Sequence, residues 1–190
     1  MNQFEQIYTQ YIKREGSEAL LEYLKKSDFF TAPASTKFHL ACEGGLAQHS
    51  VNVYKRLVDL VKREVGEDYT KVYSDETLAI VGLLHDVCKT NYYAVEMRNV
   101  KEGNEWVKKP RYIVNEKFPF GHGEKSVFIL SQYIRVTPEE AMAINWHMGG
   151  FDTRVLGGSY AVSDAFYKFK LSLLMHIADL SATYIDEERG

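Results

Sequence analysis

The spacing of apolar residues along the chain of 190 residues predicts helices over most of its length. Apolar side chains recur every three or four positions at 4–12, at 17–26 and in a long segment that begins near Leu46. This period places them on one face of a helix. Ser17 fits the N-cap of the second helix, because its hydroxyl can accept a bond from a free backbone N–H. The stretch 28–45 contains a proline and two adjacent glycines and is predicted as loop.

The second half of the chain carries clearer helix boundaries. Ser74 and the two acids after it are typical of a helix start, and this helix is predicted to end near Val87. Residues 137–140, Thr-Pro-Glu-Glu, combine a cap, an initial proline and a capping-box glutamate. Further helices are predicted from Gly121 and over 163–186, and glycine pairs at 149–150 and 157–158 bracket a loop between them.

One segment departs from the helical period. Residues 92–100 and 105–114 favour strands on either side of a polar stretch, which predicts a hairpin. Pro110 restricts the second run to an edge strand or a bend. Since there is no internal repeat or linker-like stretch, the pattern predicts one all-α domain over 1–190. Its parts are N-terminal helices at 1–27, a core at 28–187 and a hairpin insertion at 92–114.

Composition and charge limit the possible partners. The net charge of −3 argues against binding long nucleic acid by electrostatics alone. The start of the chain does not resemble a signal peptide, and no apolar run is long enough to span a bilayer. Cys42 and Cys88 form no spaced framework, which is typical of reduced thiols. We therefore expect a cytoplasmic protein without membrane contact; oligomeric state stays open.

Candidate chemistry lies in histidines and aspartates at helix positions. His85-Asp86 directly follows an apolar helix, and Asp179 lies within an apolar helical segment, where an unpaired carboxylate would be very costly. The intervals that join these residues to His49, His122 and His147 suit a helix out and a helix back. Facing helices of a bundle build metal sites in this way. Imidazole and carboxylate ligands suit divalent Mn, Fe, Zn, Mg or Ni.

This pattern resembles the H…HD…D signature of the HD-domain superfamily, which consists mostly of metal-dependent phosphohydrolases. The segment from Ala32-Pro33-Ala34 to Gly44-Gly45-Leu46-Ala47-Gln48-His49 is similar to bacterial HD-domain 3′→5′ exoribonucleases. Gly121-His122 and Trp146-His147-Met148-Gly149 resemble the added histidines of binuclear members. The resemblance covers roughly 29–186 and implies an HD-domain helical bundle.

The resemblance also implies roles for individual residues. Asp86 would bridge two metals, with His49, His85 and Asp179 on one metal and His122 and His147 on the other. A metal-activated water would attack phosphorus. Lys89 would neutralise a phosphate oxygen as a catalytic group, and Lys125 and Arg154 are further candidate phosphate contacts. His176 is expected beside the centre rather than on a metal, and His39 is expected to bond to backbone in its loop.

Two departures narrow the expected substrate. Cys88 stands where family members often have glycine, and the chain has no room for the nucleic-acid-binding domain of the exoribonucleases. A nucleotide, a cyclic or short oligonucleotide, or a similar small phosphate ester is therefore the expected substrate. Two alternatives remain open from the sequence: a di-iron oxygenase of the same fold, and a non-catalytic nucleotide-binding module. The hairpin is a candidate lid.

Overall fold

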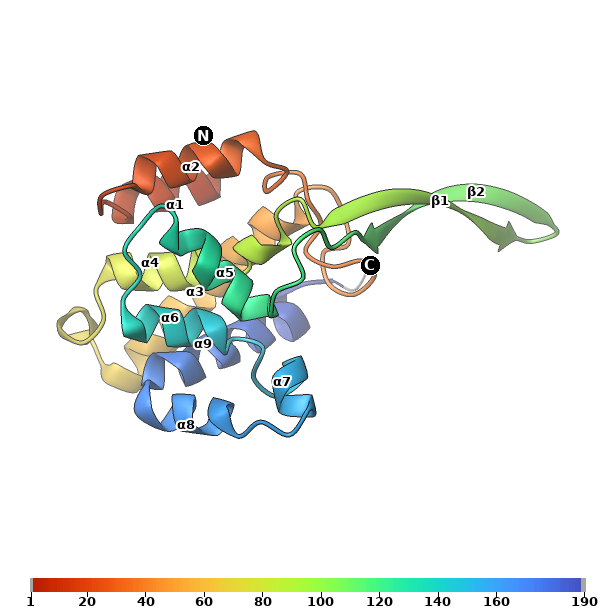
Figure 1. Cartoon of the computed structure of the whole chain (residues 1–190). Helices are drawn as coiled ribbons and strands as arrows, with labels where there is room; N and C mark the ends of the chain where they lie inside the picture. The colour runs from red at the N-terminus through yellow and green to blue at the C-terminus, as the bar shows by residue number, and fades with distance from the viewer. Residues whose placement is uncertain (1, 189–190) are drawn as a thin grey trace.

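The computed structural model describes residues 2–188 and confirms a mostly helical fold with one two-stranded hairpin (Figure 1). The elements in chain order are α1 (Gln3–Tyr11), α2 (Ser17–Lys26), α3 (Gly45–Val65), a 3₁₀ turn η1 (Tyr69–Lys71), α4 (Asp75–Leu84), a 3₁₀ turn η2 (Val87–Lys89), β1 (Tyr93–Glu102), β2 (Glu105–Val114), α5 (His122–Ser131), α6 (Pro138–Asn145), a 3₁₀ turn η3 (Gly149–Phe151), α7 (Thr153–Leu156), α8 (Ala161–Lys168), α9 (Lys170–Ser181) and a π-helical turn η4 (Ala182–Asp186). The finer assignment to the HD-domain bundle stays a prediction.

Helix α4 forms the centre of the core. Every residue from Leu78 to Leu84 is buried, as expected for a helix that is apolar on all sides. The side chain of Ser74 accepts a hydrogen bond from the backbone of Thr77 and so caps its start. Helices α1, α3 and α6 pack around it, and α9 packs against α3 and α6. The C-terminal end of α4 therefore lies among several helices.

Two glycines allow the close packing that brings α3 to the end of α4. A Cβ atom on Gly82 would lie 2.7 Å from the Cα atom of Tyr54, so any side chain there would push the two helices apart. A Cβ atom on Gly45 would lie 2.1 Å from the carbonyl oxygen of Leu40, under the loop that precedes α3. As a result His49, in the second turn of α3, reaches the end of α4.

Helix α4 ends earlier than predicted. The helix ends at Leu84 rather than near Val87, and a 3₁₀ turn follows at η2. In 3₁₀ geometry the side chains at i and i+3 lie above one another. Asp86 and Lys89 therefore meet, with 2.7 Å between the lysine Nζ and the aspartate Oδ2.

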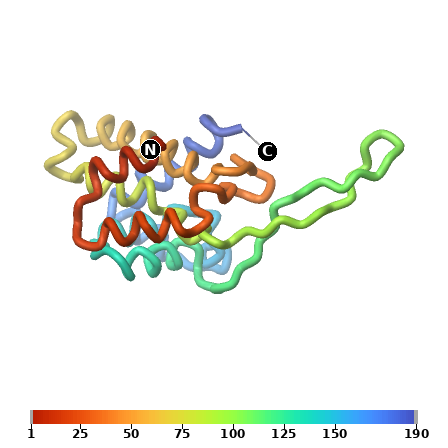
Figure 2. The backbone as a smooth tube through the Cα atoms, turned by 90° about the horizontal axis from the view of Figure 1, so that it is seen from above, coloured from red at the N-terminus to blue at the C-terminus, as the bar shows by residue number. Residues whose placement is uncertain are grey.

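The hairpin agrees with the sequence pattern and projects from the helical body (Figures 1 and 2). Glu102 pairs with Glu105, so Gly103 and Asn104 form the two-residue turn. Pro110 pairs with Met97 in a sheet of two strands, where both strands are edges. Most of its residues are exposed. Because it points away from the body, the hairpin does not cover a site in this conformation.

Three local predictions were wrong. Gly16, in the left-handed conformation at φ 86°, is the N-cap of α2, and Ser17 is its first helical residue. The helix predicted over 163–186 is interrupted at Phe169, because α9 enters the core whereas α8 buries only Ala165. The loop predicted between the glycine pairs contains the short helical segments η3 and α7.

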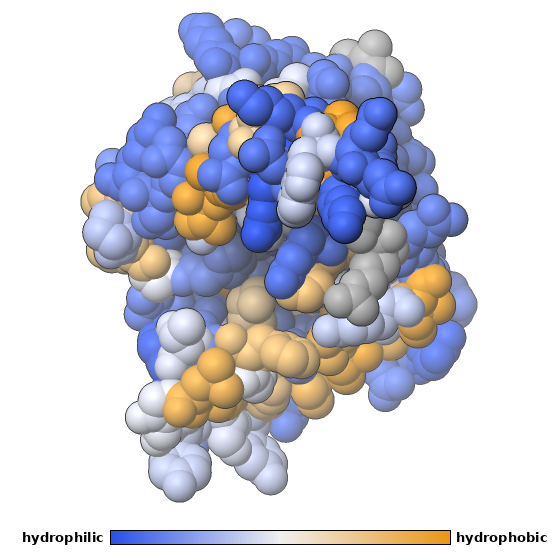
Figure 3. Space-filling view, turned by 90° about the vertical axis from the view of Figure 1, so that its right-hand side faces the viewer, coloured by the Kyte–Doolittle hydropathy of each residue, from blue (hydrophilic) through white to orange (hydrophobic). Residues whose placement is uncertain are grey.

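The surface varies between polar and apolar regions. On the face from which the hairpin projects, hydrophilic residues cover the upper part and apolar groups gather lower down (Figure 3). Within residues 2–188, no helix has both the length and the apolar character that a membrane crossing requires.

Candidate metal centre

The six predicted ligands come together at the C-terminal end of α4. His49 comes from α3, His122 begins α5 and Asp179 comes from α9, whereas His85, Asp86 and His147 lie in the turns that follow α4 and α6. Their ligand atoms, together with the Sγ atom of Cys88, form overlapping groups within 4.8 Å: His49, His85 and Asp179; His85, Asp86 and His147; Asp86, Cys88 and His122. This buried cluster has the composition and spacing to hold metal ions.

Asp86 stands between the two sets of histidines. Its Oδ1 atom lies 2.8 Å from His122 Nε2 and 3.5 Å from His147 Nε2. Its Oδ2 atom lies 3.6 Å from His85 Nε2 and 3.7 Å from His49 Nε2. Each carboxylate oxygen thus faces a different pair of imidazoles, which is the arrangement that a bridging ligand requires.

Backbone carbonyls orient two of the imidazoles. His85 Nδ1 donates to the carbonyl of Gly82 at 2.9 Å, and His147 Nδ1 donates to the carbonyl of Ile144 at 2.7 Å. A neutral imidazole that carries its proton on Nδ1 has a free electron pair on Nε2. Both electron pairs therefore lie on the side of Asp86, and His85 Nε2 also lies 3.3 Å from His49 Nε2. His147 Nε2 is buried and has no hydrogen-bond partner within residues 2–188.

Carboxylates flank His49 on both sides. Its Nε2 atom lies 3.2 Å from Asp179 Oδ1, and its Nδ1 atom lies 3.0 Å from Glu187 Oε1. Glu187 also accepts a hydrogen bond from Asn52 at 2.9 Å and lies 2.6 Å from the Nδ1 atom of His39. The expectation that His39 bonds to backbone was therefore wrong, because its ring contacts a carboxylate. Glu187 was not predicted as part of the site, because it lies in an ordinary acidic run at 186–188.

The surroundings favour the metal-binding forms of His85 and Asp86. Burial lowers the pKa of His85 to about 3, since the nearby carboxylates only partly oppose it. Burial raises the pKa of Asp86, but Lys89, His85 and other neighbours outweigh this effect and hold the pKa well below its usual range. A neutral imidazole and an ionised carboxylate are the forms that bind a metal.

The flanking histidines favour the protonated form in the absence of metal. Burial lowers the pKa of His49, but Asp179 and Glu187 outweigh it and raise the pKa to about 9. For His122, burial likewise lowers the pKa, whereas Cys88 and Asp86 raise it to about 10. A metal ion would have to displace protons from both rings.

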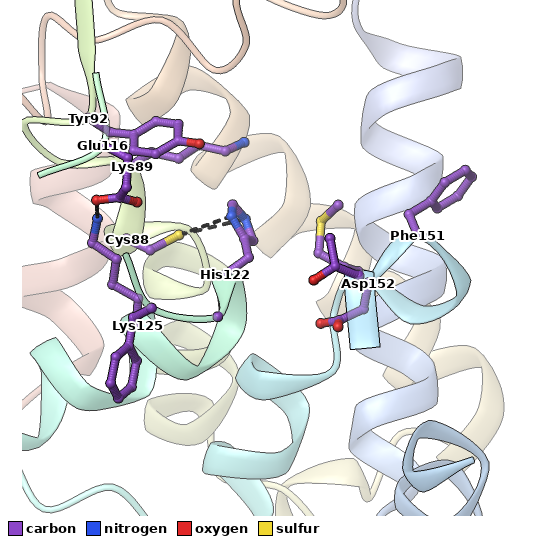
Figure 4. A pocket seen from close by; sticks show the side chains of 12 residues that line it. Cys88, Lys89, Tyr92, Glu116, His122, Lys125, Phe151 and Asp152 are labelled. Atoms are coloured by element: carbon purple, nitrogen blue, oxygen red, sulfur yellow. Dashed lines mark hydrogen bonds and ion pairs between the residues drawn. The ribbon is translucent and has the colours of Figure 1, made fainter. Parts of the chain in front are cut away.

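A pocket of about 310 Å³ opens beside His122 (Figure 4). Lys89 and Lys125, the predicted phosphate contacts, both border it, and their contact with phosphate stays a prediction. Lys89 also donates to the carbonyl of Ala34 at 2.8 Å. The full lining is Cys88, Lys89, Tyr92, Glu116, Phe120, Gly121, His122, Lys125, Met148, Phe151, Asp152 and Thr153.

Arg154 lies outside this lining. Its guanidinium packs 3.9 Å from the ring centroid of Trp146 and pairs with Glu124 and Asp152 at 2.7 Å each. Asp152 borders the pocket, so Arg154 holds a residue of the pocket wall. Its direct contact with phosphate stays a prediction.

His176 occupies the place beside the centre that the sequence predicted. Its Nδ1 atom donates to the carbonyl of His147 at 2.7 Å, and its ring stacks on Phe166. It therefore supports the turn that carries His147.

Comparison with protein-family models, with curated proteins and with solved structures gave no match. Membership of the HD-domain superfamily thus stays a prediction from the motif residues.

Proposed function

We propose that the protein is a metal-dependent phosphohydrolase of the HD-domain type. The observation that carries this proposal is a set of electron-pair donors that face one another inside the core. His85 Nε2 and His147 Nε2 lie near Asp86, and neither nitrogen carries a proton when its Nδ1 donates to a backbone carbonyl. Buried electron pairs that face a carboxylate repel it, and a divalent cation between them turns this repulsion into attraction.

The two oxygens of Asp86 divide the centre into two halves. His49, His85 and Asp179 would hold one metal, His122 and His147 the other, and Asp86 would bridge them. Bound metals supply an activated water and polarise the phosphoryl group. The donors are nitrogen and oxygen atoms, which fits Mn, Fe, Zn, Mg or Ni.

The pocket beside the centre supplies positive charge for a phosphate. The Lys89 ammonium lies 2.7 Å from Asp86 Oδ2 and borders the pocket, so it can neutralise a phosphate oxygen next to the centre. Lys125 borders the same pocket and pairs with Glu116 at 2.7 Å. A phosphate would compete with Glu116 for this ammonium, which makes Lys125 a binding residue rather than a catalytic one.

Aromatic side chains favour a substrate that carries a base. Phe120 borders the pocket and stacks on Phe118, with ring centroids 5.4 Å apart and planes at 7°. Phe128 lies 5.6 Å from both rings, and all three side chains are more than two-fifths exposed. An exposed aromatic cluster that contains a parallel pair of rings, next to a pocket that could hold a phosphate, can stack a nucleobase. We therefore propose a nucleotide, or a cyclic or short oligonucleotide, as substrate.

The test combines metal analysis with a substrate panel. Metal-free protein is loaded with each divalent metal in turn and incubated with nucleotides, cyclic and short oligonucleotides, and phosphate esters that lack a base. We expect hydrolysis with at least one metal, preferentially of the substrates with a base. Asp86→Asn should lose both bound metal and turnover, whereas Asp164→Asn, at an exposed position of α8, should retain both.

Two results would contradict the proposal. Absence of hydrolysis with every metal would reject a phosphohydrolase, and oxygen uptake by iron-loaded protein would then identify an oxygenase. Turnover that survives Asp86→Asn would reject the assigned centre.

A further inference from the structure

Cys88 lies at the metal centre although the predicted ligand set contains no thiol. It is two residues beyond Asp86 in the turn η2, is 2% exposed and borders the pocket. Its Sγ atom lies 3.5 Å from His122 Nδ1 and 3.6 Å from His122 Nε2 (Figure 4). Its backbone N–H donates to the hydroxyl of Ser126 at 3.1 Å, which fixes the turn against α5. The thiol is thus held beside a predicted ligand.

The separations around Cys88 match a shared metal ion. Metal–sulfur bonds of about 2.3 Å and metal–nitrogen bonds of about 2.0–2.1 Å at a tetrahedral angle place the two ligand atoms about 3.5 Å apart. The Sγ atom of Cys88 and the Nε2 atom of His122 are 3.6 Å apart. Both residues also share a group with Asp86 in which all ligand atoms lie within 4.8 Å.

His147 provides an independent sign that a ligand belongs here. Its Nε2 atom is buried, has no hydrogen-bond partner in the described part of the chain and lies 3.5 Å from Asp86 Oδ1. This is the same oxygen that His122 Nε2 reaches at 2.8 Å. An electron pair on a buried nitrogen costs free energy unless something binds it. Cys88 and His122 thus share one group of ligand atoms with Asp86, and His147 faces the same carboxylate oxygen as His122.

We propose that Cys88 binds, as a thiolate, the metal ion held by Asp86, His122 and His147. The inference rests on the proposed metal centre and adds a fourth protein ligand to one half of it. On binding, the Cys88 thiol and His122 Nε2 each release a proton to solvent, and sulfur and nitrogen each donate an electron pair to the metal. The half that contains His49, His85 and Asp179 keeps only nitrogen and oxygen ligands.

The thiolate makes the two halves differ in metal preference. Sulfur ligands favour Zn²⁺, Co²⁺ and Cd²⁺, whereas Mg²⁺ and Mn²⁺ prefer oxygen and nitrogen. The Cys88 half should therefore select a softer metal than its neighbour. We therefore expect the two halves to bind two different metals.

Cobalt spectroscopy tests the proposal without measuring activity. The sequence contains two cysteines, so Cys42→Ser leaves Cys88 as the one thiol, and Cys42 is exposed. We expect metal-free Cys42→Ser protein to develop a near-ultraviolet thiolate-to-cobalt charge-transfer band together with visible d–d bands. The double variant Cys42→Ser/Cys88→Ser should keep the d–d bands and lose the charge-transfer band.

The outcomes separate this inference from the proposed function. Cobalt uptake by Cys42→Ser with d–d bands but no charge-transfer band would overturn the role of Cys88 and leave the metal centre intact. No cobalt uptake at all would overturn both. ¹¹³Cd NMR of the Cys42→Ser protein gives a second reading that needs no change at Cys88: thiolate ligation requires a strong downfield shift, and a resonance in the range of oxygen and nitrogen ligands would overturn it.

Affinity measurements distinguish ligation from packing. Cys88→Ser should weaken Cd²⁺ binding roughly tenfold to a hundredfold, while Mn²⁺ binding changes only a few-fold. An equal loss for both metals would show that Cys88 only fills space, and would overturn the proposal.

Discussion

The carboxylate of Glu187 holds His49, His39 and Asn52 at once. A carboxylate that accepts the Nδ1–H of a metal-binding histidine fixes the ring and raises its basicity. Burial raises the pKa of Glu187, but His39, His49 and Asn52 outweigh it and lower the pKa to about 2, so the group is ionised at neutral pH. Glu187 is thus a positioning residue for one half of the centre.

Replacing Glu187 should weaken metal binding without unfolding the protein. We expect Glu187→Gln to lower metal affinity by roughly tenfold to a hundredfold, because the amide holds His49 less firmly and removes a negative charge. Isothermal titration of metal-free protein measures the change. Glu188→Gln is the matched control, since its side chain is exposed and next in sequence. Equal affinities for Glu187→Gln and the control would contradict the positioning role.

The metal-free protein should lose stability as pH rises above neutrality. The folded-state pKa of His49 is about 9, against about 6.5 in an unfolded chain. Its contribution is therefore fully present below about pH 6.5 and is lost as pH rises to about 9. His122 acts in the same direction, with a pKa of about 10. His85, whose pKa is lowered to about 3, matters only below about pH 6.5.

Thermal denaturation of chelator-treated protein at about pH 6.5, 8 and 9 measures this loss. Metal affinity should increase over the same interval, because the metal competes with protons for His49 and His122. The variant His49→Gln should flatten the slope. A melting temperature of metal-free protein that increases towards pH 9 would contradict the assignment.

Residues of the centre were predictable where an ionisable side chain stands in an otherwise apolar helical segment, because this placement is rare. A histidine followed by aspartate after an apolar helix, and an aspartate within one, conflict with burial unless they have partners. Glu187 shows no such conflict, because a carboxylate within an acidic run is ordinarily solvated. Its partners His39 and His49 lie 148 and 138 positions away, which only the fold reveals.

At the scale of elements, prediction succeeded where a local signal sets the boundary. Helix α6 begins at Pro138 because Thr137 and Glu140 form the expected capping box. The end of α4 and the break at Phe169 are set by what each segment packs against, and periodicity does not contain this information. The hairpin was predictable because its turn and its strand propensities are local.

Glu140 links α6 to Arg14 and to Thr77 of α4. Its side chain is fully buried, closes the capping box, forms two bonds of 2.9 Å to Arg14 and accepts one of 3.0 Å from Thr77. Glu140→Ala leaves the partly buried Arg14 charge with only Glu76 and the Arg135 carbonyl and removes the buried carboxylate from the capping box, so we expect a loss of about 3 kcal/mol in the free energy of unfolding. Urea denaturation measures this loss.

The control for this change is Glu22→Ala. Glu22 is 59% exposed, and its replacement should alter the free energy by less than about 0.5 kcal/mol. A similarly small effect of Glu140→Ala would show that Arg14 finds other partners. Because His147 follows α6, reduced metal retention is also expected in Glu140→Ala.

At the scale of the whole molecule, the hairpin contributes little to the core. Only its base packs on the body, through Tyr93, whose hydroxyl donates to the carbonyl of Ala34 at 3.1 Å. Sequence reasoning predicted the all-α fold class and the hairpin itself. It could not predict the direction of the hairpin, because exposed strands carry no pattern that specifies a packing partner.

Shortening the hairpin should therefore leave the fold and the centre intact. Residues 95–112 are replaced by Asn-Gly, which joins the paired residues Ala94 and Ile113 through a tight turn. We expect a melting temperature and metal content close to those of the unaltered protein, measured by circular dichroism and elemental analysis. Tyr93→Ala should be the more destabilising change, and the reverse order would contradict this division of the molecule.

The pairing of Asp86 with Lys89 has a consequence for the order of events on the ribosome. The centre needs residues from His49 to Asp179, so a nascent chain that has emerged just past α4 contains Asp86 with His49 and His85 but lacks His122, His147 and Asp179. Lys89, three positions after Asp86, emerges almost simultaneously, and in the folded chain it supplies the opposite charge at 2.7 Å. Asp86 therefore has a cationic partner in its own turn before the C-terminal part of the centre is synthesised.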